Sequence, residues 1–256
     1  MRKAHDRSQR PRNRIAGHGL AYRRGRMKLN IFSGCTEYGS EVQAFKDRGH
    51  AVETCGLSGE VTYLQDIREF HSEKYYHFMS FHPDCKEFSK ANWRAGKCKD
   101  RHPDLSVVEA CFRIVREAKP RFWMIENPQG CLRYFIGRPQ YCIRYGDFGH
   151  YCQKPTDLWG VLPFFQTMKM NTVIKGKHNI TAMTLGPRRA DQRALVPYGL
   201  SMALCLAIED AYDSSKTLKL PPLSDRYPAL QVRGITKRTG NDSCDSRKMR
   251  ERTYRM

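Results

Sequence analysis

The sequence has no long apolar run. None approaches the roughly 18 residues that a membrane-spanning helix requires, and residues 1–19 lack the apolar core of a secretory signal peptide. We therefore expect a cytoplasmic protein with no membrane partner.

Closely spaced cysteine pairs are also missing. Ten cysteines are scattered along the chain without framework spacing, which is typical of reduced thiols. Cys142, His150 and Cys152 lie near one another in sequence, but no Cys-x-x-Cys pair completes a tetrahedral zinc set. We expect no metal site.

Acidic residues are few for the size of the chain. There are 26 Asp and Glu against 45 Lys and Arg among 256 residues, a net charge of +19. Such a charge attracts polyanions, of which nucleic acid is the commonest, although a basic surface can also serve solubility alone. The length of 256 residues suits one sizeable domain.

Composition divides the chain into three parts. Residues 1–26 form a basic arm with a single acid, Asp6, which either holds DNA phosphates or is a solvated tail. Residues 27–213 form the folded domain, within which residues 160–187 have little regular pattern. Residues 214–256 form a second basic tail, expected to be largely disordered.

Strand-like and helix-like segments alternate within the domain, which predicts an α/β fold with a Rossmann-like sheet and helices on both faces. The glycines of the first turn lack G-x-G-x-x-G spacing, so a dinucleotide is not indicated. We expect strands at 27–32, 49–57, 75–81 and 122–125, and a short strand or loop at 63–67 that leads to a helix start at 68–70. We also expect a hairpin over 141–149 and 153–159, and helices at 41–48, 103–118 and 196–210.

Two side chains at predicted strand ends are candidates for chemistry. Cys85 follows an apolar strand and a turn, at the edge where open α/β sheets bind ligands. Glu126 directly follows another apolar strand, where a carboxylate is costly to bury without a purpose. The alternatives are a small buried thiol and a carboxylate that caps a turn. Asp66 is likewise either a helix cap or a ligand contact.

These motifs resemble, in their order, those of DNA cytosine-5 methyltransferases, and the chain is similar to a compact, phage-type member over residues 28–210. Phe32-Ser33-Gly34 resembles the first turn, and the block from His82 to Ser89 resembles the loop of the nucleophile. Ile125-Glu126-Asn127-Pro128 resembles the Glu-Asn motif, and Tyr145-Gly146-Asp147 with Lys154-Pro155-Thr156 resembles the basic motif. Arg188 to Ala190 and Val196-Pro197-Tyr198 resemble the closing motifs.

The resemblance implies an activity and assigns roles to residues. The implied reaction moves a methyl group from S-adenosylmethionine to C5 of cytosine in DNA through a covalent bond between Cys85 and C6. A phage-encoded monomer would act in the host cytoplasm. The implied residues are Cys85, Glu126 and Asn127 for catalysis, Phe32, Ser33, Gly34, Glu37 and Asp66 for the cofactor, and Ser89, Arg144 and Lys154 for the substrate.

The chain departs from the family pattern at three places. Asp84 precedes the cysteine where many members have proline, and it should raise the thiol pKa unless Lys86 or another cation offsets it. Gly56 ends the second strand where an acid usually binds the ribose, so Glu53 is a possible substitute. The Gln-x-Arg-x-Arg motif is reduced to Arg144 and Lys154.

These departures leave other functions open. The interval between Lys154 and Arg188 has no room for a large target-recognition domain, so the resemblance implies a reduced target-recognition segment at about 160–187. We therefore expect short or lax sequence specificity. The alternatives to a cytosine-5 methyltransferase are transfer of a modified group to a pyrimidine, and an inactive nucleic-acid-binding protein on the same scaffold.

Overall fold

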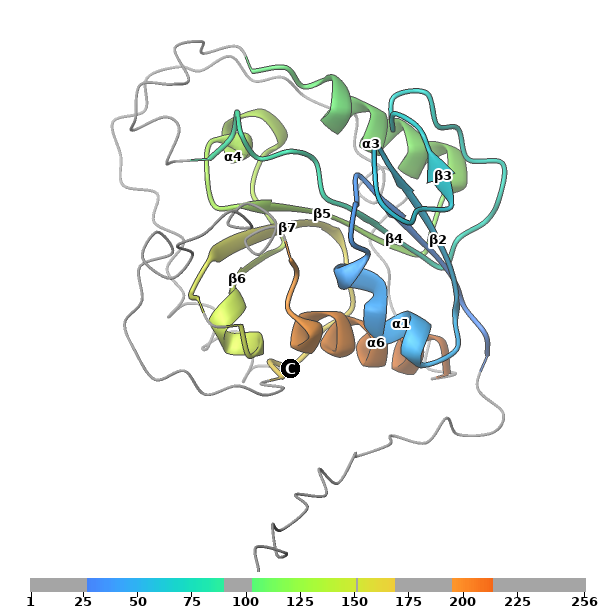
Figure 1. Cartoon of the computed structure of the whole chain (residues 1–256). Coiled ribbons are helices and arrows are strands. Elements are labelled where there is room, and N and C mark those ends of the chain that lie inside the picture. The colour runs from blue at the N-terminus through green and yellow to red at the C-terminus, as the bar shows by residue number, and fades with distance from the viewer. Residues whose placement is uncertain (1–26, 90–102, 151, 169–194, 214–256) are drawn as a thin grey trace, which may run out of the picture.

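The computed structural model of the chain describes residues 27–89, 103–150, 152–168 and 195–213, which form a layered α/β structure (Figure 1). One seven-stranded sheet has the order β3-β2-β1-β4-β5-β7-β6. The strands are β1 Asn30–Gly34, β2 Ala51–Gly56, β3 Tyr63–Leu64, β4 Phe78–Phe81, β5 Phe122–Pro128, β6 Tyr141–Arg144 and β7 Pro155–Val161.

The first five strands are parallel, and the last pairings reverse direction. β7 lies between β5 and β6 and pairs antiparallel with both. The central strands β4 and β5 are buried almost throughout, as expected for strands covered by helices on both faces. β4 is apolar except for Ser80, and β5 is apolar until Glu126 and Asn127 near its end.

Helices cover both faces of the sheet (Figure 1). The helical segments are η1 Ser40–Val42, α1 Gln43–Asp47, α3 Ser106–Ala118, α4 Leu132–Ile136, η2 Tyr145–Phe148 and α6 Tyr198–Asp213. α3 and α4 lie on one side, and α1 and α6 lie on the other. α3 buries one apolar stripe and ends where Lys119 adopts a left-handed conformation before Pro120.

The predicted fold class, a Rossmann-like sheet with helices on both faces, is confirmed. The expected hairpin is also present as the antiparallel pair β6 and β7. One part of it differs, because residues 145–148 form the 3-10 helix η2 instead of continuing the strand. The buried Tyr145 and Phe148 face the core from this turn.

Cysteine oxidation differs from the expectation in one place. Seven described cysteines are free thiols, whereas Cys142 is disulfide-bonded, so the expectation of reduced thiols throughout was wrong for Cys142. Scattered spacing in sequence cannot identify a single pair that the fold brings together.

The predicted arm (1–26), the predicted tail (214–256), the closing motif at residues 188–190 and most of the segment 160–187 lie outside the described residues. The division into these parts therefore stays a prediction. Among the described helices, none is long and apolar enough to cross a membrane.

Candidate active site

The loops after β4 and β5 are joined at the carboxyl edge of the sheet. Asn127 donates a hydrogen bond from Nδ2 to the carbonyl oxygen of Pro83, over 2.9 Å. Further along both loops, Cys131 N–H donates to the carbonyl oxygen of Phe88 over 2.9 Å. A side chain at Gly130 would place its Cβ only 1.9 Å from that same oxygen, so this approach requires glycine. The loop that carries Cys85 is therefore fixed beside Glu126 and Asn127.

Cys85 begins a single turn of helix-like backbone. Its carbonyl oxygen accepts hydrogen bonds from the N–H groups of Phe88 and Ser89, and Ser89 also pairs with Gly130 across the two loops. The Cys85 side chain is partly buried. Its loop therefore has a fixed backbone and leaves the thiol with limited access to solvent.

The pKa of the Cys85 thiol is raised, first by burial and then by the charges of Glu126 and Asp84. Lys154 acts in the opposite direction. Asp84 forms an exposed ion pair with Lys86, 2.9 Å between Oδ2 and Nζ. The expected effect of Asp84 on the thiol pKa is thus confirmed in direction, and Lys154 is a cation that opposes it.

Glu126 is a buried carboxylate with three polar neighbours. Tyr145 donates its hydroxyl to Oε1 over 2.7 Å, His82 Nδ1 lies 3.2 Å from Oε2, and Lys154 Nζ lies 3.9 Å from Oε1. Burial alone would raise the pKa of Glu126. The charge of Lys154 and the bonds from His82 and Tyr145 outweigh it and lower the pKa to about 2. Glu126 is therefore ionised at neutral pH.

The two basic residues predicted for the substrate differ in position. Lys154 is mostly buried, near Glu126, and its Nζ lies over the ring of Tyr145 at 4.7 Å from the centroid. Arg144 is exposed at the end of β6, and its side chain makes no hydrogen bond or ion pair within the described part of the chain. The structure thus brings Cys85, Glu126, Asn127 and Lys154 together, while the side chain of Arg144 forms no bond to any of these described residues.

The first turn, after β1, is packed closely against its neighbours. The ring of Phe32 is fully buried and stacks on Phe70 at 4.7 Å. Ser33 donates its hydroxyl to buried Glu41 over 2.5 Å. A Cβ at Gly34 would lie 2.8 Å from the ring of Phe81, so packing explains this glycine. Of the polar side chains predicted for the cofactor in this turn, Glu37 is exposed to solvent.

The acidic side chains near β2 and β3 already have partners. Asp66 accepts hydrogen bonds from the backbone N–H and the guanidinium of Arg68. Residues 67–69 form a turn, so the expected helix start at 68–70 was wrong, and Asp66 holds this turn instead of capping a helix. Glu53 lies within β2 and not at its end, and it binds Lys74 Nζ at 2.7 Å and the hydroxyls of Tyr63 and Tyr76. Glu53 is therefore engaged by side chains of the protein, three residues before Gly56 ends β2.

Three contributors to this site were not predicted from the sequence: His82, Tyr145 and Glu41. In the register of the sheet, Phe81 pairs with Ile125, so His82 and Glu126 follow at equivalent positions on adjacent strands. The sequence predicted both strands but not their register, so it could not show that His82 and Glu126 lie side by side. Tyr145 belongs to the block that resembles the basic motif, but that resemblance assigned it no role.

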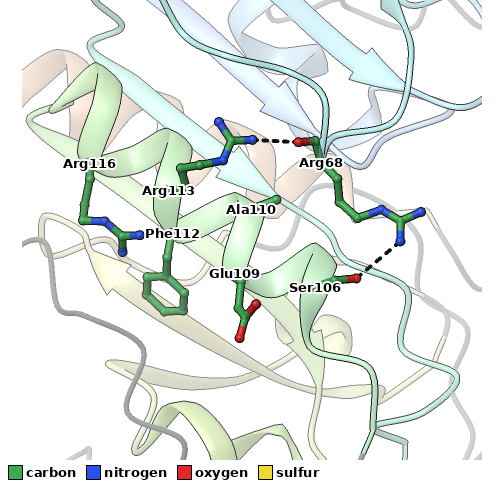
Figure 2. A pocket seen from close by; sticks show the side chains of 7 residues that line it. All are labelled: Arg68, Ser106, Glu109, Ala110, Phe112, Arg113 and Arg116. Carbon is green, nitrogen blue, oxygen red and sulfur yellow. Dashed lines mark hydrogen bonds between the residues drawn. The ribbon is translucent and has the colours of Figure 1, made fainter.

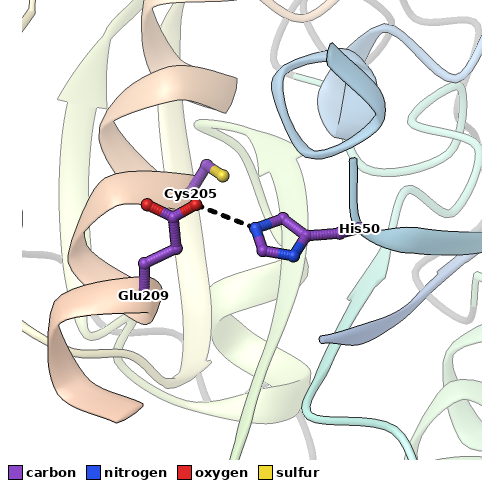
Figure 3. Close-up of side chains that lie close together, drawn as sticks. All are labelled: His50, Cys205 and Glu209. Carbon is purple, nitrogen blue, oxygen red and sulfur yellow. Dashed lines mark hydrogen bonds and ion pairs between the residues drawn. The ribbon is translucent and has the colours of Figure 1, made fainter. Parts of the chain in front are cut away.

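A second buried polar cluster lies between α1 and α6 and joins His50, Cys205 and Glu209 (Figure 3). This cluster is a network of ion pairs and hydrogen bonds. His50 Nδ1 accepts the N–H of Leu29 at 3.2 Å, and His50 Nε2 lies 2.9 Å from Glu209 Oε1. Arg48 binds both carboxylate oxygens of Glu209, at 2.8 and 2.7 Å. Both ring nitrogens are thus engaged, and the cluster is not suited to holding a metal ion.

A surface cavity of about 560 Å³ lies along α3 (Figure 2). Two of its three arginines are engaged within the protein, since Arg113 donates to the carbonyl oxygens of Arg68 and Phe70 and Arg68 donates to Ser106. The lining residues are Arg68, Ser106, Glu109, Ala110, Phe112, Arg113 and Arg116. It contains none of the predicted site residues.

No protein-family model matches the chain, and no curated protein matches it. Solved structures with partial similarity include a protein described as a candidate DNA modification methyltransferase encoded within an E. coli prophage. It is 13% identical, the match covers 51% of this chain and 45% of that chain, and the TM-score is 0.37. Another is a complex of DhpI with SAM and HEP, at 11% identity, 53% and 64% coverage and a TM-score of 0.27. The matches thus span less than two thirds of either protein, and they assign no activity to this chain.

Proposed function

We propose that this chain transfers a methyl group from S-adenosylmethionine to C5 of cytosine in DNA, through a covalent bond between Cys85 and C6 of the ring. The observation that carries the proposal is the hydrogen bond from Asn127 to Pro83, which holds the loop of the thiol beside the ionised carboxylate of Glu126. The thiol that would attack the ring and the carboxylate that would bind it then lie at the same edge of the sheet.

The chemistry requires both groups. Cytosine C5 is a poor nucleophile, so the ring must first be activated by addition of a thiolate at C6. In this proposal Cys85 forms that bond, Glu126 accepts a hydrogen bond from the exocyclic amine and shares a proton with N3, and Asn127 keeps the loop in place. Loss of the C5 proton then releases Cys85. Because C6 cannot be reached inside a duplex, the base must be flipped out or already single-stranded.

S-adenosylmethionine, when bound, supplies the methyl group that C5 receives. Of the proposed cofactor residues, exposed Glu37 suits the hydroxyl and amine groups of such a ligand, and the backbone of Ser33 and Gly34 borders the same turn. Asp66 fits less readily, because Arg68 already binds its carboxylate. Phe32 would support the turn from the core.

The proposed substrate contacts are Ser89 and Lys154 near the thiol and Arg144 at the exposed end of β6. Arg144 fits a phosphate contact better than a contact to the base, since its side chain is exposed. We place the enzyme, as a monomer, on DNA in the cytoplasm, with residues 27–213 as its methyltransferase domain.

Incubation with tritiated S-adenosylmethionine and DNA tests the activity. Wild type should label DNA, and Cys85→Ser should not. DNA that contains 5-fluorocytosine should trap wild type covalently, because fluorine blocks the final elimination. An absence of transfer by wild type, with DNA binding retained, would support the non-catalytic alternative instead.

A further inference from the structure

We propose that His82 is a positioning residue that stores the proton which Glu126 passes to N3 of the pyrimidine during thiolate addition. This inference rests on the proposed function. The reaction needs a proton that ionised Glu126 does not carry. The inference names His82 as its source.

The need arises from the charge of Glu126. When a thiolate adds to C6, an electron pair moves through the ring toward N3, and a proton at N3 stabilises it. A carboxylate with a pKa of about 2 accepts hydrogen bonds but carries no proton to give at neutral pH. A second group must therefore supply the proton through the carboxylate.

Of the three neighbours of Glu126, His82 is the most suitable source. Burial raises the pKa of Tyr145 well above its ordinary value, so the phenol retains its proton. Lys154 lies 3.9 Å from the carboxylate, beyond hydrogen-bond distance. His82 Nδ1 is 3.2 Å from Oε2, and histidine is the side chain that exchanges protons near neutral pH.

The surroundings of His82 favour its charged form. Its side chain is only 11% exposed, and burial by itself lowers its pKa, as does the charge of Lys154. The bond to Glu126 and the charges of Glu126 and Glu41, on η1, outweigh both and raise the pKa. Tyr145 and Cys85 are the other titratable groups around this pair.

One nitrogen of the ring is left for a further contact. His82 Nε2 is buried and has no hydrogen-bond partner within the described residues. The hydroxyl of Ser80, in β4, is also buried and has no hydrogen-bond partner within the described residues. The Nε2 atom of His82 therefore offers one hydrogen bond that no described residue takes up.

The proton transfer balances as follows. The Cys85 sulfur forms its bond to C6, the C5=C6 pair becomes the C4=C5 bond, and the C4=N3 pair moves to N3. N3 takes a proton from the Glu126 carboxyl as Glu126 takes one from His82 Nδ1. The pair changes from imidazolium and carboxylate to neutral imidazole and carboxylate, and the proton returns when Cys85 leaves.

The variant His82→Asn tests this role, because an Asn side-chain amide can replace the Nδ1–H donor but stores no exchangeable proton. His71→Asn is the control, since His71 is 65% exposed and pairs with Glu117 away from the site. Single-turnover methyl transfer is measured against pH. The thiolate fraction of Cys85 grows with pH, so we expect the rate of wild type and His71→Asn to stop rising above the pKa of His82, where the stored proton is lost. His82→Asn should be about 10-fold slower or worse, and its rate should continue to rise with pH over that range.

NMR titration of the histidine rings gives a readout that does not depend on activity. The pKa of His82 should lie above about 6.5 in wild type and fall below it in Glu126→Gln. A His82 pKa at or below 6.5 in wild type overturns the inference, as does a wild-type rate and pH profile in His82→Asn. If wild type transfers no methyl group, the proposed function fails, and the titration still decides whether His82 stores a proton.

Discussion

The side-chain amide of Asn127 binds the backbone carbonyl of Pro83, and both residues are buried. This bond joins the ends of two adjacent parallel strands, β4 and β5, two residues before the thiol of Cys85. A residue next to the candidate carboxylate thus fixes the backbone of the candidate nucleophile.

Replacing Asn127 with Ala should destabilise the protein by about 1–3 kcal/mol, because the carbonyl of Pro83 would be left buried without a donor. Asn127→Asp should cost more, since an ionised carboxylate cannot donate and would repel both the carbonyl and Glu126. Urea unfolding measures both changes. Unchanged stability in both variants would show that the bond does not hold the loop.

The reactivity of Cys85 should follow the charges around it. Asp84→Asn removes a group that raises the thiol pKa, and Lys154→Met removes one that lowers it. We therefore expect iodoacetamide at fixed pH to modify Cys85 a few-fold faster in the first variant and slower in the second. Mass spectrometry of the Cys85 peptide measures the rates without interference from other thiols. Equal rates in the two variants would contradict the electrostatic account.

Acid should weaken the protein partly through Glu126. Its pKa is lowered from 4.5 to about 2 on folding, so its contribution is present above about pH 4.5 and is lost as pH falls toward 2. At about 1.4 kcal/mol for each pKa unit, the contribution is roughly 3 kcal/mol. Unfolding measured across this range should depend less on pH in Glu126→Gln than in wild type.

The opposite sign applies to His82, whose pKa is raised on folding. Its contribution is present below its ordinary value of about 6.5 and is lost as pH rises through the folded value. The stabilising effect of the pair should therefore be largest between about pH 4.5 and 6.5. Parallel curves for wild type and Glu126→Gln over the whole range would contradict both assignments.

The cluster around Glu209 should matter for stability and not for metal binding. Glu209→Gln leaves the buried guanidinium of Arg48 without its counter-charge, which should cost about 3–5 kcal/mol in urea unfolding. Added Zn²⁺ should not raise the melting temperature of wild type, because both nitrogens of His50 are engaged. A rise in melting temperature that His50→Gln abolishes would instead reveal a metal site.

Target recognition should be limited to about four base pairs or fewer, because the chain has no room for a large recognition domain. Bisulfite sequencing of DNA exposed to the enzyme reads the methylated positions. A longer recognition sequence would count against this expectation. Deleting residues 1–26 should weaken DNA binding and reduce its salt dependence, if that arm contacts phosphates.

Much of the fold could be predicted because its strands and helices carry strong local patterns. β5 was predicted from its apolar run and α3 from its helical spacing. The insertion of β7 between β5 and β6 was not, because strand order depends on contacts between distant segments. The 3-10 turn at Tyr145 was mistaken for strand, since its aromatic residues suit a strand as well as a buried turn.

The sequence predicted the thiol and the carboxylate of the candidate site, but it did not predict the side chains that surround them. Cys85 and Glu126 follow apolar strands, and this local signal was sufficient to predict that both lie at the carboxyl edge of the sheet. The neighbours that set the charge of Glu126, His82 and Tyr145, are defined by strand register and by a turn. The partners of Glu53 could not be predicted either, because Lys74, Tyr63 and Tyr76 come from segments that local patterns do not connect.

The reversed direction of β7 determines which end of that strand can serve the site. Because β7 runs opposite to β5, its first residues lie at the edge where the parallel strands finish. Lys154 immediately precedes β7 and so reaches Glu126. Had β7 been parallel, its seven residues, at about 3.3 Å each, would have placed Lys154 roughly 20 Å away at the opposite edge. The reversed direction of β7 thus places Lys154 beside Glu126. In a uniformly parallel sheet, that carboxylate would lack this cation.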